Sequence, residues 1–310
     1  MKYIEVGIIA FVVSYILTPY ITNVGKKQNM VDVPGHRKVH EEAIPNLGGI
    51  VIFFGFLFSL LLVVTIEGQY RALLIGGVII LLLGIIDDIA DLSPKIKFII
   101  QVTPALIVIA FNHQLIHSFI IIQLKNLGLL GYLMYPVLIL WIVGVTNSIN
   151  LVDGLDGLAC GISIIALSSL LILGIFFQIE NLNILVTAML FSMLAFLKYN
   201  FYPAKIFLGD SGSTFAGFMI ASISVLWAIQ SQKALFLFVP VIILALPIFD
   251  TLFAIFRRYR EHRPIFQADQ GHLHHRLLLR GIEHKNVVLL MWGISFLFSV
   301  VALIFVFIFR

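Results

Sequence analysis

The sequence is poor in charge and in cysteine. Only 12% of its 310 residues are charged and 60% are hydrophobic, whereas a soluble domain has about 25% charged residues. This composition excludes a soluble enzyme and a nucleic-acid-binding protein, and it indicates a membrane protein with several spans. The single cysteine, Cys160, excludes an intrachain disulfide, and we expect it to be a small packing residue.

Ten apolar runs, each near the length that crosses a bilayer, follow one another along the chain. They predict an all-α polytopic membrane protein with about ten transmembrane helices, folded as a single domain over residues 1–310. The runs lie near 4–22, 47–66, 71–86, 96–112, 129–149, 158–178, 182–200, 212–230, 234–256 and 286–308.

The positive charges are distributed unevenly between the two sides of the predicted bundle. An even number of spans places both termini on one side, and most of the 20 Lys and Arg fall in loops on the other. Cytoplasmic loops carry such an excess, so we expect these loops to be cytoplasmic and both termini to lie outside. A basic cytoplasmic face attracts anionic membrane lipids and would equally attract a phosphorylated substrate. The sequence therefore predicts a multi-pass protein of the plasma membrane with a cytoplasmic active site.

The longest outer loop, roughly residues 113–128, contains a β-branched stretch from His117 to Leu124. Such a stretch predicts a strand or a small hairpin. The loop carries no acidic residue, and we assign it no chemistry.

The first of four acidic clusters on the basic side ends the third apolar run, with Asp87, Asp88 and Asp91. Acids at the C-terminal end of a helix oppose its dipole and repel one another. The cluster is unfavourable unless a cation or a basic ligand is present, although a solvated polar cap is the simpler interpretation. Lys97 follows as either a counterion or a phosphate-binding residue.

A second cluster repeats polar side chains at a spacing of three after the fifth run. The residues are Asn147, Asn150, Asp153 and Asp156, which a helical or tightly turned segment would align along one edge. Oxygen-bearing side chains in this register suit a hard cation such as Mg²⁺, hydrogen bonds to a nucleobase or sugar, or both. The alternative is ordinary turn chemistry, which would not require the register.

Phe207 and Asp210 precede the eighth run. Asp210 is either a helix N-cap or a metal-binding carboxylate beside backbone N–H groups that hold phosphate. Phe207 is as compatible with lipid packing as with a binding role. In the longest basic loop, Asp269 precedes His272, His274, His275 and Arg276.

The histidine cluster has three interpretations besides a plain polar loop. Three histidines could ligate a transition metal, donate hydrogen bonds to diphosphate oxygens, or shuttle a proton. Asp250 lies deeper, within the ninth apolar run, and is either functional or a structural partner for a basic residue. The residues leave these alternatives open.

Together these segments resemble the polyprenyl-phosphate N-acetylhexosamine-1-phosphate transferases, nearest to the bacterial enzymes that use UDP-GlcNAc and undecaprenyl phosphate. The match extends from Arg37 to Arg276. Related phospho-MurNAc-pentapeptide transferases have a Lys where this chain has Asp91, which favours the GlcNAc branch. The five motifs, in family order, are Arg37-Lys38-Val39-His40 with Pro45–Gly49, Asp87–Asp91, Asn147–Gly157, Phe207–Asp210 and His272–His275.

The resemblance implies a role for each candidate residue. Asp210 would bind Mg²⁺, which Mn²⁺ could replace, together with Asn150. Asp87 and Asp88 would lie at the reacting phosphates, with Asp153 supporting the metal and the diphosphate. Asp156 would pair with uracil and Phe207 would stack on it. The remaining substrate-binding candidates are Asn147, Lys97, His272, His274, His275 and Arg276.

The implied activity is transfer of GlcNAc-1-phosphate from UDP-GlcNAc to undecaprenyl phosphate, an early membrane step of cell-surface glycan synthesis. A homodimer is suggested by related enzymes. The nearest rival is a phospho-MurNAc-pentapeptide transferase. An ion-coupled transporter is a rival of another class, but it would place ionisable residues near the bilayer midplane, where only Asp250 comes close.

Overall fold

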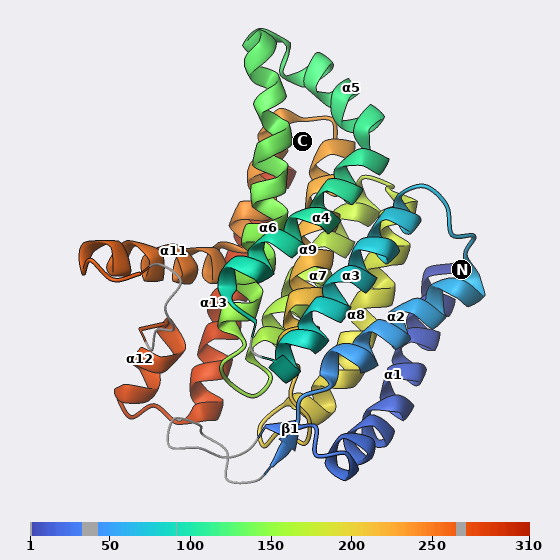
Figure 1. The fold of residues 1–310 in the computed structure, drawn as a ribbon. Coiled ribbons are helices and arrows are strands. Elements are labelled where there is room, and N and C mark those ends of the chain that lie inside the picture. The colour runs from blue at the N-terminus through green and yellow to red at the C-terminus, as the bar shows by residue number, and fades with distance from the viewer. Residues whose placement is uncertain (1, 33–42, 91, 265–270) are drawn as a thin grey trace.

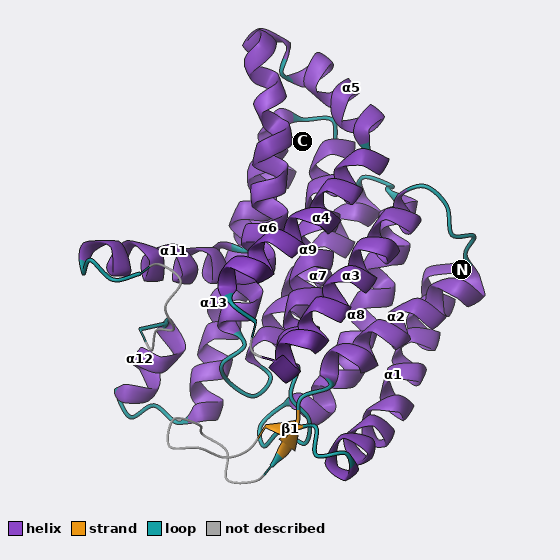
Figure 2. Ribbon diagram, viewed as in Figure 1, coloured by secondary structure: helices purple, strands orange, loops and turns teal. Residues whose placement is uncertain are grey.

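The computed structural model describes residues 2–32, 43–90, 92–264 and 271–310, and these residues are almost entirely helical (Figures 1 and 2). In these ranges the only strands are β1 (Val31–Asp32) and β2 (Ile44–Pro45), which pair antiparallel. The predicted all-α membrane fold is confirmed. The helices are α1 (Lys2–Lys27), α2 (Gly48–Val63), α3 (Gln69–Ala90), α4 (Pro94–Phe111), α5 (His113–Gln123), η1 (Lys125–Leu133), α6 (Met134–Val152), α7 (Leu158–Phe176), α8 (Glu180–Asn200), α9 (Gly209–Gln230), η2 (Ala234–Phe238), α10 (Val239–Ile243), α11 (Ala245–Arg260), α12 (Leu273–Leu279) and α13 (His284–Phe309).

Eight helices in the described part of the chain are long and apolar enough to cross a membrane. Every predicted apolar run contains a helix, but two runs do not form a simple span. The second holds only α2, which is 16 residues long. The ninth is broken at Leu244, where α10 and α11 meet at an angle of 77°. In Figure 1, α11 consequently projects sideways from the bundle instead of running alongside its neighbours.

Helix α9 occupies the centre of the bundle and is buried along its apolar length. Its sequence is rich in Gly, Ala and Ser, and small residues allow helices in a membrane to approach closely. Gly84 of α3 shows how close the approach is, because a side chain there would overlap the Ser211 backbone in the first turn of α9. The C-terminal end of α3 therefore lies directly against the N-terminal end of α9.

One end of the bundle collects the acidic motifs, and we call it the acidic end. It contains the C-terminal ends of α3 and α6 and the N-terminal end of α9, near β1 in Figure 1. Helix α1 runs toward this end and α13 runs away from it, so both chain termini lie toward the other end (Figure 1). An even number of spans predicted that both termini lie on one side of the bundle, and they do.

The stretch expected to form a strand or hairpin is helical, and that prediction was wrong. His117–Leu124 falls mainly within α5, which buries Ile116, Phe119 and Ile120 along one face. Beside lipid, a helix satisfies its own backbone hydrogen bonds, whereas a short unpaired strand does not. This constraint outweighs the β-propensity of the isoleucines.

Some residues named from the sequence lie outside the described residues. They are Arg37, Lys38, His40, Asp91 and Asp269.

Candidate active site

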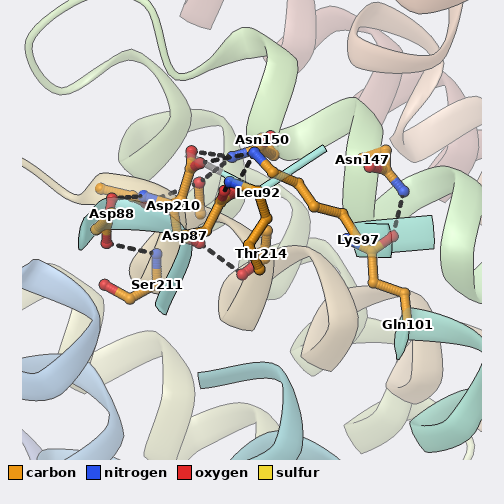
Figure 3. A network of polar contacts seen from close by, with 12 residues as sticks. Asp87, Asp88, Leu92, Lys97, Gln101, Asn147, Asn150, Asp210, Ser211 and Thr214 are labelled. Atoms are coloured by element: carbon orange, nitrogen blue, oxygen red, sulfur yellow. Dashed lines mark hydrogen bonds and ion pairs between the residues drawn. The ribbon is translucent and has the colours of Figure 1, made fainter. Parts of the chain in front are cut away.

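The acidic end is centred on a lysine held between two carboxylates. Lys97, in the first turn of α4, forms ion pairs with Asp87 of α3 and Asp210 of α9, the latter at 3.3 Å (Figure 3). Asp87 is almost fully buried, and its other oxygen accepts a hydrogen bond from the Leu92 backbone N–H at 2.9 Å. Three helices thus converge on one cation position between two acids. The sequence left Lys97 open as a counterion or a phosphate-binding residue, and here it is the counterion of Asp87 and Asp210.

Asn150 ties α6 into this centre. Its amide nitrogen donates to Asp210 Oδ1 at 2.7 Å and to Ser213 Oγ at 2.9 Å. The second carboxylate oxygen of Asp210 is the one that faces Lys97. We call these four residues, Asp87, Lys97, Asn150 and Asp210, the carboxylate centre.

Asp88 points to a different group, the N-terminal end of α9. Its Oδ1 accepts the Asp210 N–H at 2.9 Å and its Oδ2 accepts the Ser211 N–H at 3.0 Å, and both bonds are drawn in Figure 3. Asn46 donates a further hydrogen bond to Oδ1 at 2.7 Å. Asp210 is therefore not the N-cap of α9, because Asp88 of α3 satisfies the first N–H groups of that helix.

Asn147, one turn before Asn150 on α6, faces α4. Its amide nitrogen donates to Gln101 Oε1 at 2.5 Å (Figure 3) and to the Val143 carbonyl at 2.8 Å. Gln101 is itself buried and lies one turn beyond Lys97. The pair thus fixes the distance between α4 and α6 beside the carboxylate centre.

Asp153 follows α6 and lies within the electrostatic reach of the acidic end. Burial, reinforced by the negative charges of Asp210, Asp88 and Asp156, raises the pKa of the Asp153 carboxyl well above its usual range. This interaction places Asp153 in the same charged neighbourhood as Asp210 and Asp88.

Asp156 lies at the edge of the acidic end that α8 and α13 border. Its Oδ2 accepts the Ala204 N–H at 2.9 Å, and its own backbone N–H donates to His284 Nε2 at 3.0 Å. The His284 ring packs on Tyr202, with ring centroids 4.7 Å apart. Asp156 is thus beside two aromatic rings that the sequence did not single out.

Phe207 is half-buried where the segment before α9 meets the segment before α2. Its N–H donates to the Pro45 carbonyl at 2.8 Å, and its own carbonyl accepts from the Gly48 N–H at 3.0 Å. Two motifs that are far apart in sequence are therefore joined by backbone hydrogen bonds. Phe207 lies three residues before Asp210, on the chain that leads into the carboxylate centre.

The histidines occupy the short helix α12 and the residue before it. His272 Nδ1 hydrogen-bonds Asp250 Oδ2 at 2.8 Å, and the His274 ring lies 5.9 Å from the His272 ring and 4.2 Å from that of His275. Arg276 follows and is exposed. We call His272–Leu279 the histidine helix.

His274 packs against the turn that carries Asp153. A side chain at Gly154 would overlap the His274 imidazole, so the glycine allows this close contact. The ring is 1% exposed, and neither ring nitrogen has a hydrogen-bond partner in the described residues. Burial lowers the pKa of His274 to about 3, so the imidazole is neutral. Buried polar atoms without partners are costly, and these two nitrogens suit a polar ligand at the acidic end.

The donor set suits a magnesium ion better than a metal held only by protein. Within the described ranges, no three His, Cys, Asp or Glu side chains gather around one metal position. Magnesium usually takes one or two carboxylates together with substrate phosphates. Asp87 and Asp210, which already flank one cationic nitrogen, match that requirement. Asn150, predicted as a ligand, here donates its amide hydrogen bonds to Asp210 and Ser213.

Sequence reasoning missed four members of this site. Asn46, Gln101, Ser213 and His284 each bond a predicted residue. Gln101 stands within an apolar run, and Ser213 lies three residues after Asp210, and both positions are usable signals. His284 is the first residue of α13, just before the last apolar run, and nothing in the sequence connects it to Asp156.

Comparison with known proteins indicates the family of the chain. The family model of glycosyl transferase family 4 matches residues 70–228, which contain the whole carboxylate centre. A probable undecaprenyl-phosphate N-acetylglucosaminyl 1-phosphate transferase of Bacillus subtilis (strain 168) is 41% identical, over 96% of this chain and 84% of its own length. A decaprenyl-phosphate N-acetylglucosaminephosphotransferase of Mycobacterium leprae is 32% identical over 93% of this chain and 79% of its own. An undecaprenyl-phosphate alpha-N-acetylglucosaminyl 1-phosphate transferase of Thermotoga maritima is 30% identical over 94% and 87%.

Proposed function

The chain belongs to glycosyl transferase family 4, and on that premise we propose that it transfers GlcNAc-1-phosphate from UDP-GlcNAc to undecaprenyl phosphate. The products are undecaprenyl-diphosphate-GlcNAc and UMP. The relatives named for this type of reaction match nearly the whole chain, which supports a sugar-phosphate transferase acting on a polyprenyl phosphate. The reaction would begin the membrane stage of a cell-surface glycan.

The observation that carries the proposal is the shared cation position of the carboxylate centre. Donor and acceptor are both anionic, so bringing them together costs Coulomb energy unless positive charge lies between them. Lys97 supplies one positive charge beside Asp87 and Asp210. These carboxylates would also hold Mg²⁺, or Mn²⁺ in its place, which when bound neutralises charge on the diphosphate.

The chemistry needs mainly positioning. An oxygen of the lipid phosphate attacks the sugar-side phosphorus of the diphosphate, and the bond from that phosphorus to the bridging oxygen breaks to release UMP. The lipid phosphate is already ionised at neutral pH, so no strong base is needed and direct attack is favoured over an aspartyl-phosphate. Asp88 contributes indirectly, because it fixes the start of α9 and thereby Asp210.

The nucleotide and diphosphate would occupy two sides of the carboxylate centre. Asp156, beside Tyr202 and His284, would pair with uracil, and Phe207 would stack on it. His274 would donate or accept a hydrogen bond at the diphosphate or sugar, because its buried nitrogens have no partner in the described residues. Arg276 is exposed nearby on the same short helix.

The orientation follows from the charges. The acidic end of the bundle is also the end at which the Lys- and Arg-rich loops lie, with Lys26, Lys27 and Lys205 near it. A positive-inside arrangement would place it in the cytoplasm, where nucleotide sugars are available, and would make the protein a resident of the plasma membrane. The undecaprenyl tail would remain in the bilayer beside the bundle.

The test is an assay of the purified full-length protein with UDP-GlcNAc, undecaprenyl phosphate and Mg²⁺, measuring UMP release. We expect release that requires the lipid and the metal, and that stops with a chelator and returns with Mg²⁺ or Mn²⁺. UDP-GalNAc and UDP-MurNAc-pentapeptide serve as matched donors that determine the branch. UMP release that is independent of the lipid, or absent with every donor, would overturn the proposal.

A further inference from the structure

Asp250 is a buried acid that the reaction as described does not use. It lies in α11 and is 8% exposed. Both of its carboxylate oxygens form hydrogen bonds with the start of the histidine helix. Oδ2 hydrogen-bonds His272 Nδ1 at 2.8 Å, and Oδ1 accepts the Leu273 backbone N–H at 2.8 Å. A buried carboxylate is costly unless it is paired. Both of these bonds therefore favour one placement of α12.

Helix α11 holds the same segment at a second point. Arg257 Nη1 donates to the Gly271 carbonyl at 2.9 Å. Arg257 lies seven residues after Asp250, which is about two turns and hence the same face of the helix. The residues from Gly271 to Leu273 are thus fixed to α11 by an acid at one end and a guanidinium at the other.

The fixed segment leads directly to His274. His274 lies two residues after His272, and the two rings are stacked. The His274 ring rests on Gly154, beside Asp153. The Leu273 N–H is one of the groups at a helix start that has no partner within the helix. Because Asp250 satisfies it, the acid determines where α12 begins and how its first turn is aimed.

We propose that Asp250 is a positioning residue that holds the histidine helix so that His274 faces the Asp153–Gly154 turn, and that it affects the transfer reaction only through His274. This inference rests on the proposed function for its kinetic consequence. The anchoring itself rests on geometry alone. Asp250 has two partners in the described structure, the His272 ring and the Leu273 backbone N–H. Its sequence position had left open whether it is functional or pairs with a basic residue.

The first experiment compares Asp250→Ala and Asp250→Asn with Glu261→Gln in the full-length protein. Glu261 follows the same helix on an exposed surface, so its replacement is the matched control. Asn retains an oxygen for the Leu273 N–H but loses the charge opposite His272. We expect kcat to fall about 100-fold in Asp250→Ala, as a displacement of about 1 Å can cause, with a smaller fall in Asp250→Asn and none in the control.

A double-mutant cycle separates positioning from general destabilisation. If Asp250 acts through His274, then Asp250→Ala should reduce kcat little further in a His274→Ala background. The KM for UDP-GlcNAc should rise in Asp250→Ala, whereas a mere loss of folded protein would lower the maximal rate at unchanged KM. Additive losses, or wild-type kcat and KM in Asp250→Ala, would overturn the inference.

Proteolysis gives a readout that does not depend on the reaction. Arg276 is exposed but lies within α12, so trypsin cleaves after it only when that helix unfolds locally. Asp250→Ala should be cleaved after Arg276 at least tenfold faster, relative to cleavage after the exposed Lys205, in the segment before α9 of the same molecule. An unchanged ratio would reject the anchor, whereas a wild-type protein without transferase activity would reject the proposed function.

Discussion

The carboxylate centre and the histidine helix are the two parts of the proposed site, and the structure holds them in different ways. Every member of the centre lies on a membrane-spanning helix and bonds another member. The histidine helix has only seven helical residues, and it is held by Asp250, by contact with Gly154 and by packing of its leucines against the core. The difference indicates that charge is organised before substrate arrives, whereas the histidines depend on local packing that is easier to disturb.

The two regions also differ in what remains unsatisfied. In the centre, carboxylates face a lysine or backbone and amide N–H groups, so their charge is compensated by protein. In the histidine helix, the two nitrogens of His274 are buried without partners in the described residues. The first region therefore suits a permanent electrostatic role, and the second suits contact with a ligand that comes and goes.

The strongest way to break the centre is Asp210→Ala. It removes the carboxylate that bonds both Lys97 and Asn150, and we expect kcat to fall by about 10³-fold, in the range of losses seen for key electrostatic groups. In Asp210→Asn, which keeps the shape of the side chain, kcat should fall nearly as far because the negative charge is lost. UMP release measures both. Wild-type rates in either variant would remove Asp210 from the reaction, and retained UMP binding would show that the protein is folded.

Lys97→Met tests whether the centre needs its own cation. The change leaves Asp87 and Asp210 without the ammonium between them, and breaking a buried pair from one side costs about 3–5 kcal/mol, which the partial exposure of Lys97 reduces. We expect a loss of about 100-fold in kcat/KM. Lys95→Met is the matched control, since Lys95 is exposed two residues earlier on the same helix. Equal losses in the two variants would show that only the net charge of α4 matters.

The sequence predicted the centre well because its members obey simple rules. Asp87, Asn150 and Asp210 each end or begin an apolar run, and the alternation of spans placed them at one end of the bundle. What the sequence could not supply was the pairing. Asp88 accepts backbone N–H groups of α9, whereas Asp210 faces the lysine. These partners depend on how closely α3 approaches α9 at Gly84, which the sequence does not record.

The histidine helix was harder to predict for a physical reason. Its placement depends on contacts between residues far apart in sequence, such as Asp250 with Leu273 and Gly154 with His274, and no periodicity records such contacts. The bend at Leu244 did leave a signal, because Pro240 and Pro247 flank it within the ninth apolar run, but hydropathy alone predicts one continuous span there. The prediction of a strand around Ile120 was wrong for a related reason, because the membrane setting favours a helix despite the β-propensity of the residues.

Gly154→Ala disturbs the histidine region without removing a polar group. The new methyl would overlap the His274 ring, and overpacking of this kind costs about 1–3 kcal/mol. We expect kcat to fall about tenfold while Lys97 and Asp210 remain paired. Gly144→Ala, on α6, is the control because a side chain there meets no other atom within 4 Å. A loss in Gly144→Ala as large as in Gly154→Ala would mean that the helix, not the histidine contact, is sensitive.

Acid should loosen the histidine helix through His274. Its pKa is about 3 in the folded protein and 6.5 in an exposed histidine, so the detached helix binds a proton that the attached helix excludes. Below pH 6.5 this linkage favours detachment, and the stability of the attached state is lost as pH falls. Relative to pH 7.5, the opening constant should rise about twofold at pH 6.5 and about tenfold at pH 5.5, measured as tryptic cleavage after Arg276.

His274→Gln is the control that isolates this effect, because it removes the titrating group and cancels the pH dependence of trypsin itself when the two proteins are compared at each pH. The ratio of wild-type to variant cleavage should rise with acid, and a flat ratio would contradict the burial of a neutral imidazole. Cleavage at sites elsewhere in the bundle, measured at each pH in both proteins, is the reference for the effect on α12. A bundle that loosened in parallel with α12 would show that the two regions are coupled, and the contrast between a rigid centre and a detachable helix would not hold.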